Sequence, residues 1–119
     1  MLAMSFQKLQ VWQRSMKLVK SVYTLTKNFP KEEQYGLTSQ MRRSAVSIPS
    51  NIAEGSQRTS DKEFANFILI ARGSLAELHT QLLIVMDLKY ASETEIIKII
   101  NECNELSRML HALYSKLKA

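Results

Sequence analysis

The sequence predicts an all-α fold, an up-down-up-down antiparallel four-helix bundle that forms a single domain over residues 1–119. Four segments place apolar residues three and four positions apart, no segment alternates like a half-buried strand, and capping or turn residues separate the segments. The chain has 119 residues and one cysteine. At this length a core forms without disulfides or metals.

The first predicted helix covers about residues 9–27, and Pro30 and Gly36 follow it as turn signals. Its predicted core stripe consists of Leu9, Trp12, Met16, Val19 and Tyr23. The second covers about residues 38–56, and its predicted core stripe consists of Met41, Ala45, Ile48 and Ile52.

Pro49 falls inside the second helix and has no backbone N–H to donate to the carbonyl of Ala45. We therefore predict a continuous but kinked helix, in which Asn51, a nearby side chain or water satisfies the freed carbonyl. In the alternative, Ser47 caps a restarted helix with the proline in its first turn.

Two Ser-x-x-Glu capping boxes, at residues 60–63 and 92–95, predict the starts of the third and fourth helices. The third predicted stripe is Phe64, Ile68, Ala71, Leu75, Leu78, Leu82 and Val85, and the fourth is Ile96, Ile99, Cys103, Leu106, Leu110, Leu113 and Leu117. Antiparallel register sets Ala45 opposite Ala71 and predicts close backbones there, which would explain the unfavourable helical glycine Gly73.

The first two helices carry more apolar surface than one small core needs, and such surface usually marks an interface. We therefore predict a homo-oligomer built largely through the first helix. The candidate interface residues are Val11, Leu18, Val22, Leu25 and Phe29 on the first helix and Val46, Pro49 and Ala53 on the second.

The formal net charge is +5, and the first 30 residues contain basic but no acidic residues. Such a stripe could contact RNA phosphates, although a solvated helix face is the commoner explanation. The candidate nucleic-acid-binding residues are Arg14, Lys17, Lys20, Arg42, Arg43 and Arg58.

No enzymatic function, metal site or cofactor is predicted. His79 and His111 lack carboxylate or cysteine partners at ligand spacing, and no phosphate-binding or nucleophile motif occurs. Cys103 falls on a core stripe, where an inert thiol is expected. The lone cysteine and the absence of a signal-peptide pattern or a membrane-length apolar run predict a cytoplasmic protein without a membrane partner.

From Phe6 to Tyr114 the sequence resembles the small bacterial family whose first members were found encoded in intervening sequences of 23S ribosomal RNA genes. The resemblance is carried by "VW" at 11–12, "FP" at 29–30, "GLTSQ" at 36–40, Arg43, "SIPSNIAEG" at 47–55 and "GS" at 73–74. It implies a four-helix bundle that assembles as a ring-like homopentamer. A related branch is the basic accessory variability determinant (Avd) of diversity-generating retroelements, which binds a reverse transcriptase and nucleic acid.

Two functional hypotheses follow. In the first, the oligomer binds structured RNA electrostatically through its basic residues, with little sequence readout. In the second, it is a protein-interaction scaffold or accessory protein, for example for a reverse transcriptase, and its charges serve solubility.

Overall fold

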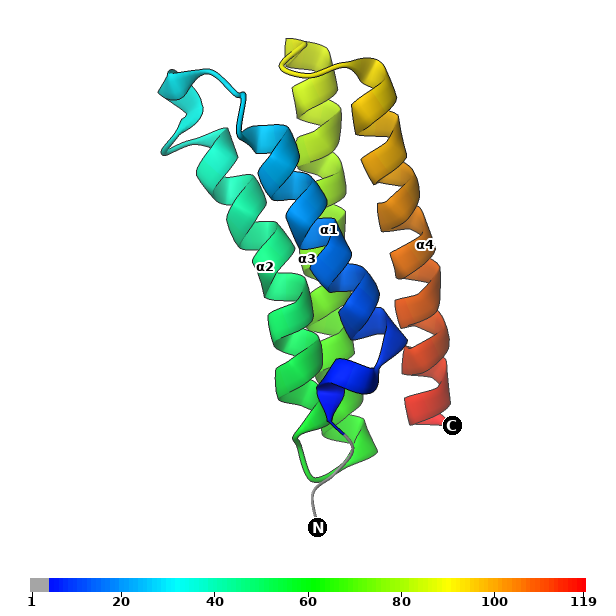
Figure 1. Cartoon of the computed structure of the whole chain (residues 1–119). Coiled ribbons are helices and arrows are strands. Elements are labelled where there is room, and N and C mark those ends of the chain that lie inside the picture. The colour runs from blue at the N-terminus through cyan, green and yellow to red at the C-terminus, as the bar shows by residue number, and fades with distance from the viewer. Residues whose placement is uncertain (1–4) are drawn as a thin grey trace.

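A computed structural model describes residues 5–119 and contains four long helices (Figure 1). Residues 1–4, part of the N-terminal stretch for which we predict no signal peptide, lie outside the described residues. The helices are α1 (Gln10–Thr26), α2 (Leu37–Ser56), α3 (Asp61–Leu88) and α4 (Glu93–Lys118), with short 3₁₀ turns at Phe6–Lys8 and Lys31–Glu33. Consecutive helices lie side by side, and residues 5–119 contain no strand, so the all-α prediction is confirmed.

Serine caps begin α3 and α4 as the sequence predicts. The Ser60 side chain accepts from the Glu63 amide at 3.1 Å, and Ser92 accepts from the Glu95 amide at 3.2 Å. Each glutamate carboxylate accepts from its serine hydroxyl, at 3.3 and 3.0 Å, rather than from the serine amide. The hydroxyl contact therefore replaces the second half of the predicted box.

The predicted core stripe of α1 is only partly confirmed: Leu9, Trp12 and Val19 are partly buried against the core, but the fully buried residues lie on the adjoining face. Five residues that the sequence analysis assigned to a subunit interface are at most 8% exposed and belong to the core: Val11, Leu18, Val22, Leu25 and Phe29. The predicted core residues Met16 and Tyr23 are instead 39% and 42% exposed. The prediction was wrong because both adjoining faces of α1 are apolar, so periodicity alone does not say which one turns inward.

Pro49 is buried within α2, which continues without a break from Leu37 to Ser56. Ser47 therefore does not cap a restarted helix. The Asn51 side-chain amide donates to the Ser47 carbonyl at 2.8 Å, and the Ser50 hydroxyl donates to the Val46 carbonyl at 2.8 Å. These bonds reinforce the turn around the proline but do not reach the Ala45 carbonyl, which was the predicted acceptor for Asn51.

The close approach of α2 and α3 depends on Gly55, and not on Gly73 as the sequence analysis predicted. A methyl group added at Gly55 would lie 2.6 Å from the Phe67 Cβ, whereas one added at Gly73 would meet nothing within 4 Å. Gly73 is exposed, so close packing does not explain it. Ala45 and Ala71 are both fully buried, and the Ser47 and Ser74 hydroxyls lie 2.8 Å apart between the same two helices.

At one end of the bundle, a carboxylate joins the two connections that meet there. Glu33 accepts from the Leu37 amide at 3.1 Å, which caps α2, and from the Tyr90 hydroxyl at 2.9 Å in the α3–α4 turn. The Phe29 and Tyr90 rings also pack with centroids 5.5 Å apart. The hydrogen bond to Glu33 raises the pKa of Tyr90, because the carboxylate favours the protonated phenol.

The outer face of α3 is apolar although its side chains are about half exposed among the described residues. Five large side chains on this helix are 42% to 52% exposed; we call Leu69, Ile70, Leu83, Ile84 and Leu88 the α3 outer face. With the opposite face of α3 in the core, the helix is long and apolar enough to cross a membrane by length and composition. The sequence analysis predicted no apolar run of membrane length, whereas this helix passes that test, as the core helices of soluble proteins also can.

Replacing the two helical glycines with alanine should have opposite effects on stability. Gly73→Ala should raise the free energy of unfolding by up to about 1 kcal/mol, because alanine favours the helix and meets no neighbour. Gly55→Ala should lower it by about 1–3 kcal/mol, because the methyl group collides with Phe67. Urea denaturation at one protein concentration measures both; a stabilising Gly55→Ala would contradict the close approach of α2 and α3.

Cys103 should be inert toward alkylation in the folded chain. It is 1% exposed, and burial, with a smaller contribution from Glu102, raises its thiol pKa from 9.0 to about 12. At pH 8 the thiolate fraction, and so the labelling rate, falls about 1000-fold relative to an unperturbed thiol. The stabilisation from the neutral thiol is complete below pH 9 and is lost as the pH rises toward about 12. Iodoacetamide labelling followed by mass spectrometry checks this; equal rates for native and urea-unfolded chain would contradict it.

Candidate nucleic-acid interface

Two of the three basic residues predicted on α1 have acidic neighbours on α4. Arg14 forms an ion pair and hydrogen bond with Glu105. Lys20 lines a hollow that also contains Glu95 and Glu102. Lys17 is exposed on the same helix. The basic surface of α1 therefore lies partly beside negative charge, which weakens its attraction for phosphate groups.

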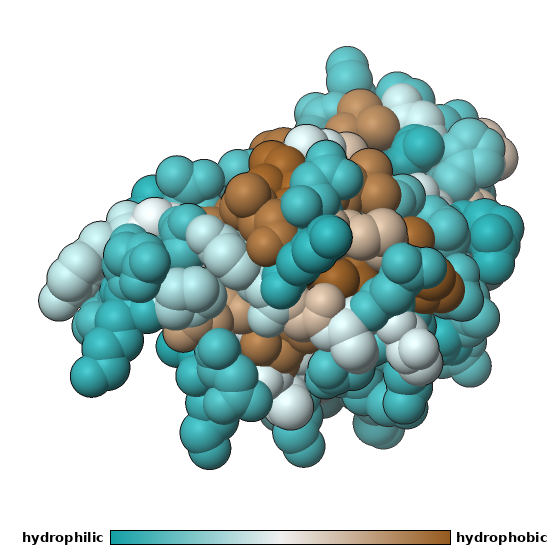
Figure 2. Space-filling model, turned by 90° about the horizontal axis from the view of Figure 1, so that it is seen from above, coloured by the Kyte–Doolittle hydropathy of each residue, from teal (hydrophilic) through white to brown (hydrophobic). Residues whose placement is uncertain are grey.

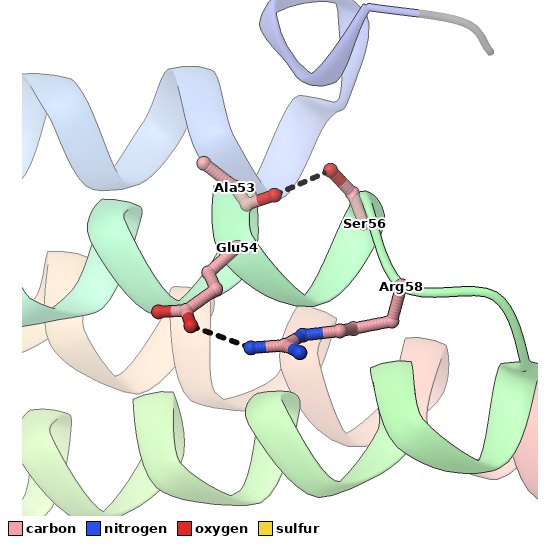
Figure 3. A network of polar contacts seen from close by, with 4 residues as sticks. All are labelled: Ala53, Glu54, Ser56 and Arg58. Atoms are coloured by element: carbon pink, nitrogen blue, oxygen red, sulfur yellow. Dashed lines mark hydrogen bonds and ion pairs between the residues drawn. The ribbon is translucent and has the colours of Figure 1, made fainter.

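Arg58, which lies just after the C-terminal end of α2, also forms an ion pair (Figure 3). Its guanidinium donates to the Glu54 carboxylate at 2.7 Å and lies 4.8 Å from the centre of the Phe67 ring. Nearby, the Ser56 hydroxyl donates to the Ala53 carbonyl at 2.8 Å, which closes the last turn of the helix. These contacts assign Arg58 a local role at the α2 terminus.

Arg42 is fixed in place without an acidic partner. Its Nε donates to the Thr26 hydroxyl at 2.9 Å, and its guanidinium carbon lies 4.4 Å from the centre of the Tyr23 ring. The Thr26 hydroxyl in turn donates to the Val22 carbonyl at 2.8 Å. Tyr23 and Thr26 thus hold the arginine on α2 against the C-terminal turns of α1.

Two adjoining hollows meet at Arg42, and together we call them the basic cradle. The larger, of about 680 Å³, is lined by Tyr23, Gln34, Tyr35, Thr38, Ser39, Arg42, Arg43, Val46 and Ser47. The smaller, of about 250 Å³, is lined by Thr26, Lys27, Phe29, Pro30, Lys31, Gln34, Thr38 and Arg42. Four of the lining side chains are cationic and none is acidic, although Glu32 and Glu33 directly follow Lys31 in the same connection. The Glu33 carboxylate is hydrogen-bonded to Leu37 and Tyr90.

The cradle lies toward the end of the bundle where α1 stops and α2 begins. Viewed from that end (Figure 2), hydrophilic side chains surround a centre of hydrophobic ones. The sequence analysis identified Arg42 and Arg43 but missed Lys27, Lys31 and Tyr35. Their clustering around the Pro30 turn was the available signal, since residues flanking a helix-helix connection come together at one end of a bundle.

A second, apolar groove runs between α1 and α2. It has a volume of about 300 Å³ and is lined by Trp12, Met16, Val19, Val46, Pro49, Ser50 and Ala53. The three α2 residues predicted for an interface, Val46, Pro49 and Ala53, therefore share a surface with residues predicted for the α1 core. Val46 is 40% exposed, whereas Pro49 is buried at the base of the groove.

The described residues offer little for catalysis. Between residues 5 and 119, no group of three or more His, Cys, Asp or Glu side chains could hold a metal ion. His79 and Cys103 line one hollow between α3 and α4. Burial raises the Cys103 pKa to about 12, which is opposite to the shift that would activate a nucleophilic thiol.

Comparison with known proteins identifies the family. Residues 7–112 match the model for the 23S rRNA-intervening sequence protein family. The chain is similar in structure to a protein with unknown function from the S23 ribosomal protein family of Bacteroides thetaiotaomicron, with a TM-score of 0.78 and 23% identity over 87% of this chain and 97% of that one. No curated protein matches the chain. The family match covers most of the sequence, and the chain therefore belongs to the 23S rRNA-intervening sequence protein family.

Proposed function

We propose that the protein is a non-enzymatic, homo-oligomeric bundle that binds RNA phosphates in the basic cradle. The observation that carries the proposal is the lining of the cradle, in which Lys27, Lys31, Arg42 and Arg43 come together without an acidic side chain. Phosphate groups bind where several cations line one surface and outnumber the acidic groups nearby, and the affinity is then strongly salt-dependent. The proposal moves the binding surface from Arg14, Lys17 and Lys20 to the end of the bundle.

Self-association is the second part of the proposal. The α3 outer face and the α1–α2 groove are apolar surfaces that one subunit leaves uncovered, and such surfaces mark interfaces. The resemblance described above implies a ring-like homopentamer. Such a ring would carry one basic cradle on each subunit. A polyanion that contacts several cradles at once would bind more tightly than one that contacts a single cradle.

A protein-interaction scaffold is the alternative function, and one observation favours it. Arg14 is paired with Glu105, and Lys20 shares a hollow with Glu95 and Glu102, so part of the basic excess in the first 30 residues faces negative charge within the subunit. In this case an α3 outer face that remains uncovered in the oligomer would receive a protein such as the reverse transcriptase partner of the related Avd branch. Binding of RNA to the purified protein distinguishes the two functions.

Removing a cradle cation should weaken RNA binding and reduce its salt dependence. Arg43→Ala and Lys31→Ala should each lower the affinity, and each should reduce the slope of log affinity against log salt by about one. Fluorescence anisotropy with a structured RNA at several salt concentrations measures both quantities.

Lys116→Ala removes the same charge from exposed α4, near the C-terminus, and is the matched control. It should leave the slope unchanged. An equal effect of all three substitutions would indicate diffuse attraction without a cradle, and no RNA binding at low salt would favour the scaffold.

A charge on the α3 outer face should break the oligomer. Ile84→Glu should reduce the mass measured by light scattering to that of a single chain, because a buried unpaired carboxylate is strongly unfavourable in an apolar contact. Circular dichroism should still report a helical chain, since Ile84 is 42% exposed in the subunit. Ser115→Glu, at an exposed position of α4, introduces the same charge and should keep the mass of the parent. A parent protein that is itself monomeric at micromolar concentration would overturn the proposal.

A further inference from the structure

Tyr35 is the most exposed large hydrophobic side chain of the described residues. It is 90% exposed in the connection just before α2, and it lines the larger hollow of the cradle together with Arg42 and Arg43. An aromatic ring in this position contributes almost nothing to the subunit core. It offers a flat apolar surface beside two cations.

The arginine next to it is already ordered. Arg42 lies over the Tyr23 ring at 4.4 Å, and its Nε is bonded to Thr26. Because that bond uses Nε, the terminal nitrogens of the guanidinium remain for an anion in the hollow. The entropy of ordering this long side chain is spent in folding and not at binding.

The remaining lining residues supply neutral polar groups. Gln34, Thr38 and Ser39 bring one amide and two hydroxyl side chains to the same hollow. Its volume of about 680 Å³ lies within the range of about 300–1,000 Å³ that is typical of small-molecule sites. The hollow thus combines an aromatic ring, fixed positive charge and hydrogen-bonding groups.

We propose that this hollow binds an unpaired nucleotide of RNA, with its base stacked on Tyr35 and its phosphate held by Arg42 and Arg43. The inference rests on the RNA-binding function proposed above and specifies which part of the RNA is recognised. Bases within an A-form duplex are stacked on one another, so only a single-stranded segment, loop or bulge presents a free base face. The protein should therefore prefer unpaired RNA, in contrast to binding by the backbone charge alone.

The test compares Tyr35→Ala with Tyr35→Phe on two RNAs of the same length, an oligouridylate single strand and a duplex. Tyr35→Ala should weaken single-strand binding about 5- to 150-fold, the range for removing one aromatic stacking partner. It should leave duplex affinity and the salt slope unchanged, because no cation is lost. Tyr35→Phe should keep the single-strand affinity within about twofold, since the ring is retained.

Arg43→Ala separates failure of this inference from failure of the proposed function. If Arg43→Ala weakens both RNAs and lowers the salt slope while Tyr35→Ala changes neither affinity, the cradle binds phosphates and the nucleotide site is overturned. If the parent protein binds neither RNA at low salt, the proposed function itself fails. Unchanged thermal melting of Tyr35→Ala, expected from the 90% exposure of the ring, excludes unfolding as the cause of lost binding.

Discussion

Close packing of α2 against its neighbours is the constraint on which the rest of the structure depends. On one side Gly55 brings the α2 backbone against Phe67, and the Ser47 and Ser74 hydroxyls meet between the same helices. On the other side Pro49 forms the base of the groove shared with α1. The "SIPSNIAEG" stretch therefore packs against α3 and lines the groove that faces α1. This gives a packing reason for the glycine, whereas the proline is buried and lines the groove between α1 and α2.

Helix positions and types could be predicted from the sequence, whereas the orientation of α1 could not. Periodicity located all four helices, and the serine caps fixed where α3 and α4 begin. Both adjoining faces of α1 are apolar, and the choice between them depends on tertiary packing. Ser15 and Thr26 can be buried on the inner face because their hydroxyls donate hydrogen bonds to carbonyls of the same helix, those of Trp12 and Val22.

The candidate site was only partly predictable, for an electrostatic reason. The sequence shows how many charges a segment carries, but their effect depends on neighbours from other segments. Arg14 meets Glu105 from 91 positions away, and this removes it from the free basic surface. Arg42 and Arg43 were identified, yet their association with Lys27 and Lys31 requires the turn that brings the end of α1 to the start of α2.

Glu33 determines how rigidly that turn is held. The carboxylate caps α2 and holds the α3–α4 turn through Tyr90, and a side chain at Gly36 would come within 2.9 Å of it. The connection that contributes Gln34 and Tyr35 to the cradle is thus held by two hydrogen bonds of Glu33 within the subunit. A preorganised loop loses little conformational freedom when it is occupied, so its contacts contribute more fully to affinity. For the proposed nucleotide site, the backbone beside the hollow would then be arranged before binding, and the exposed Tyr35 ring would be the part that becomes ordered on binding.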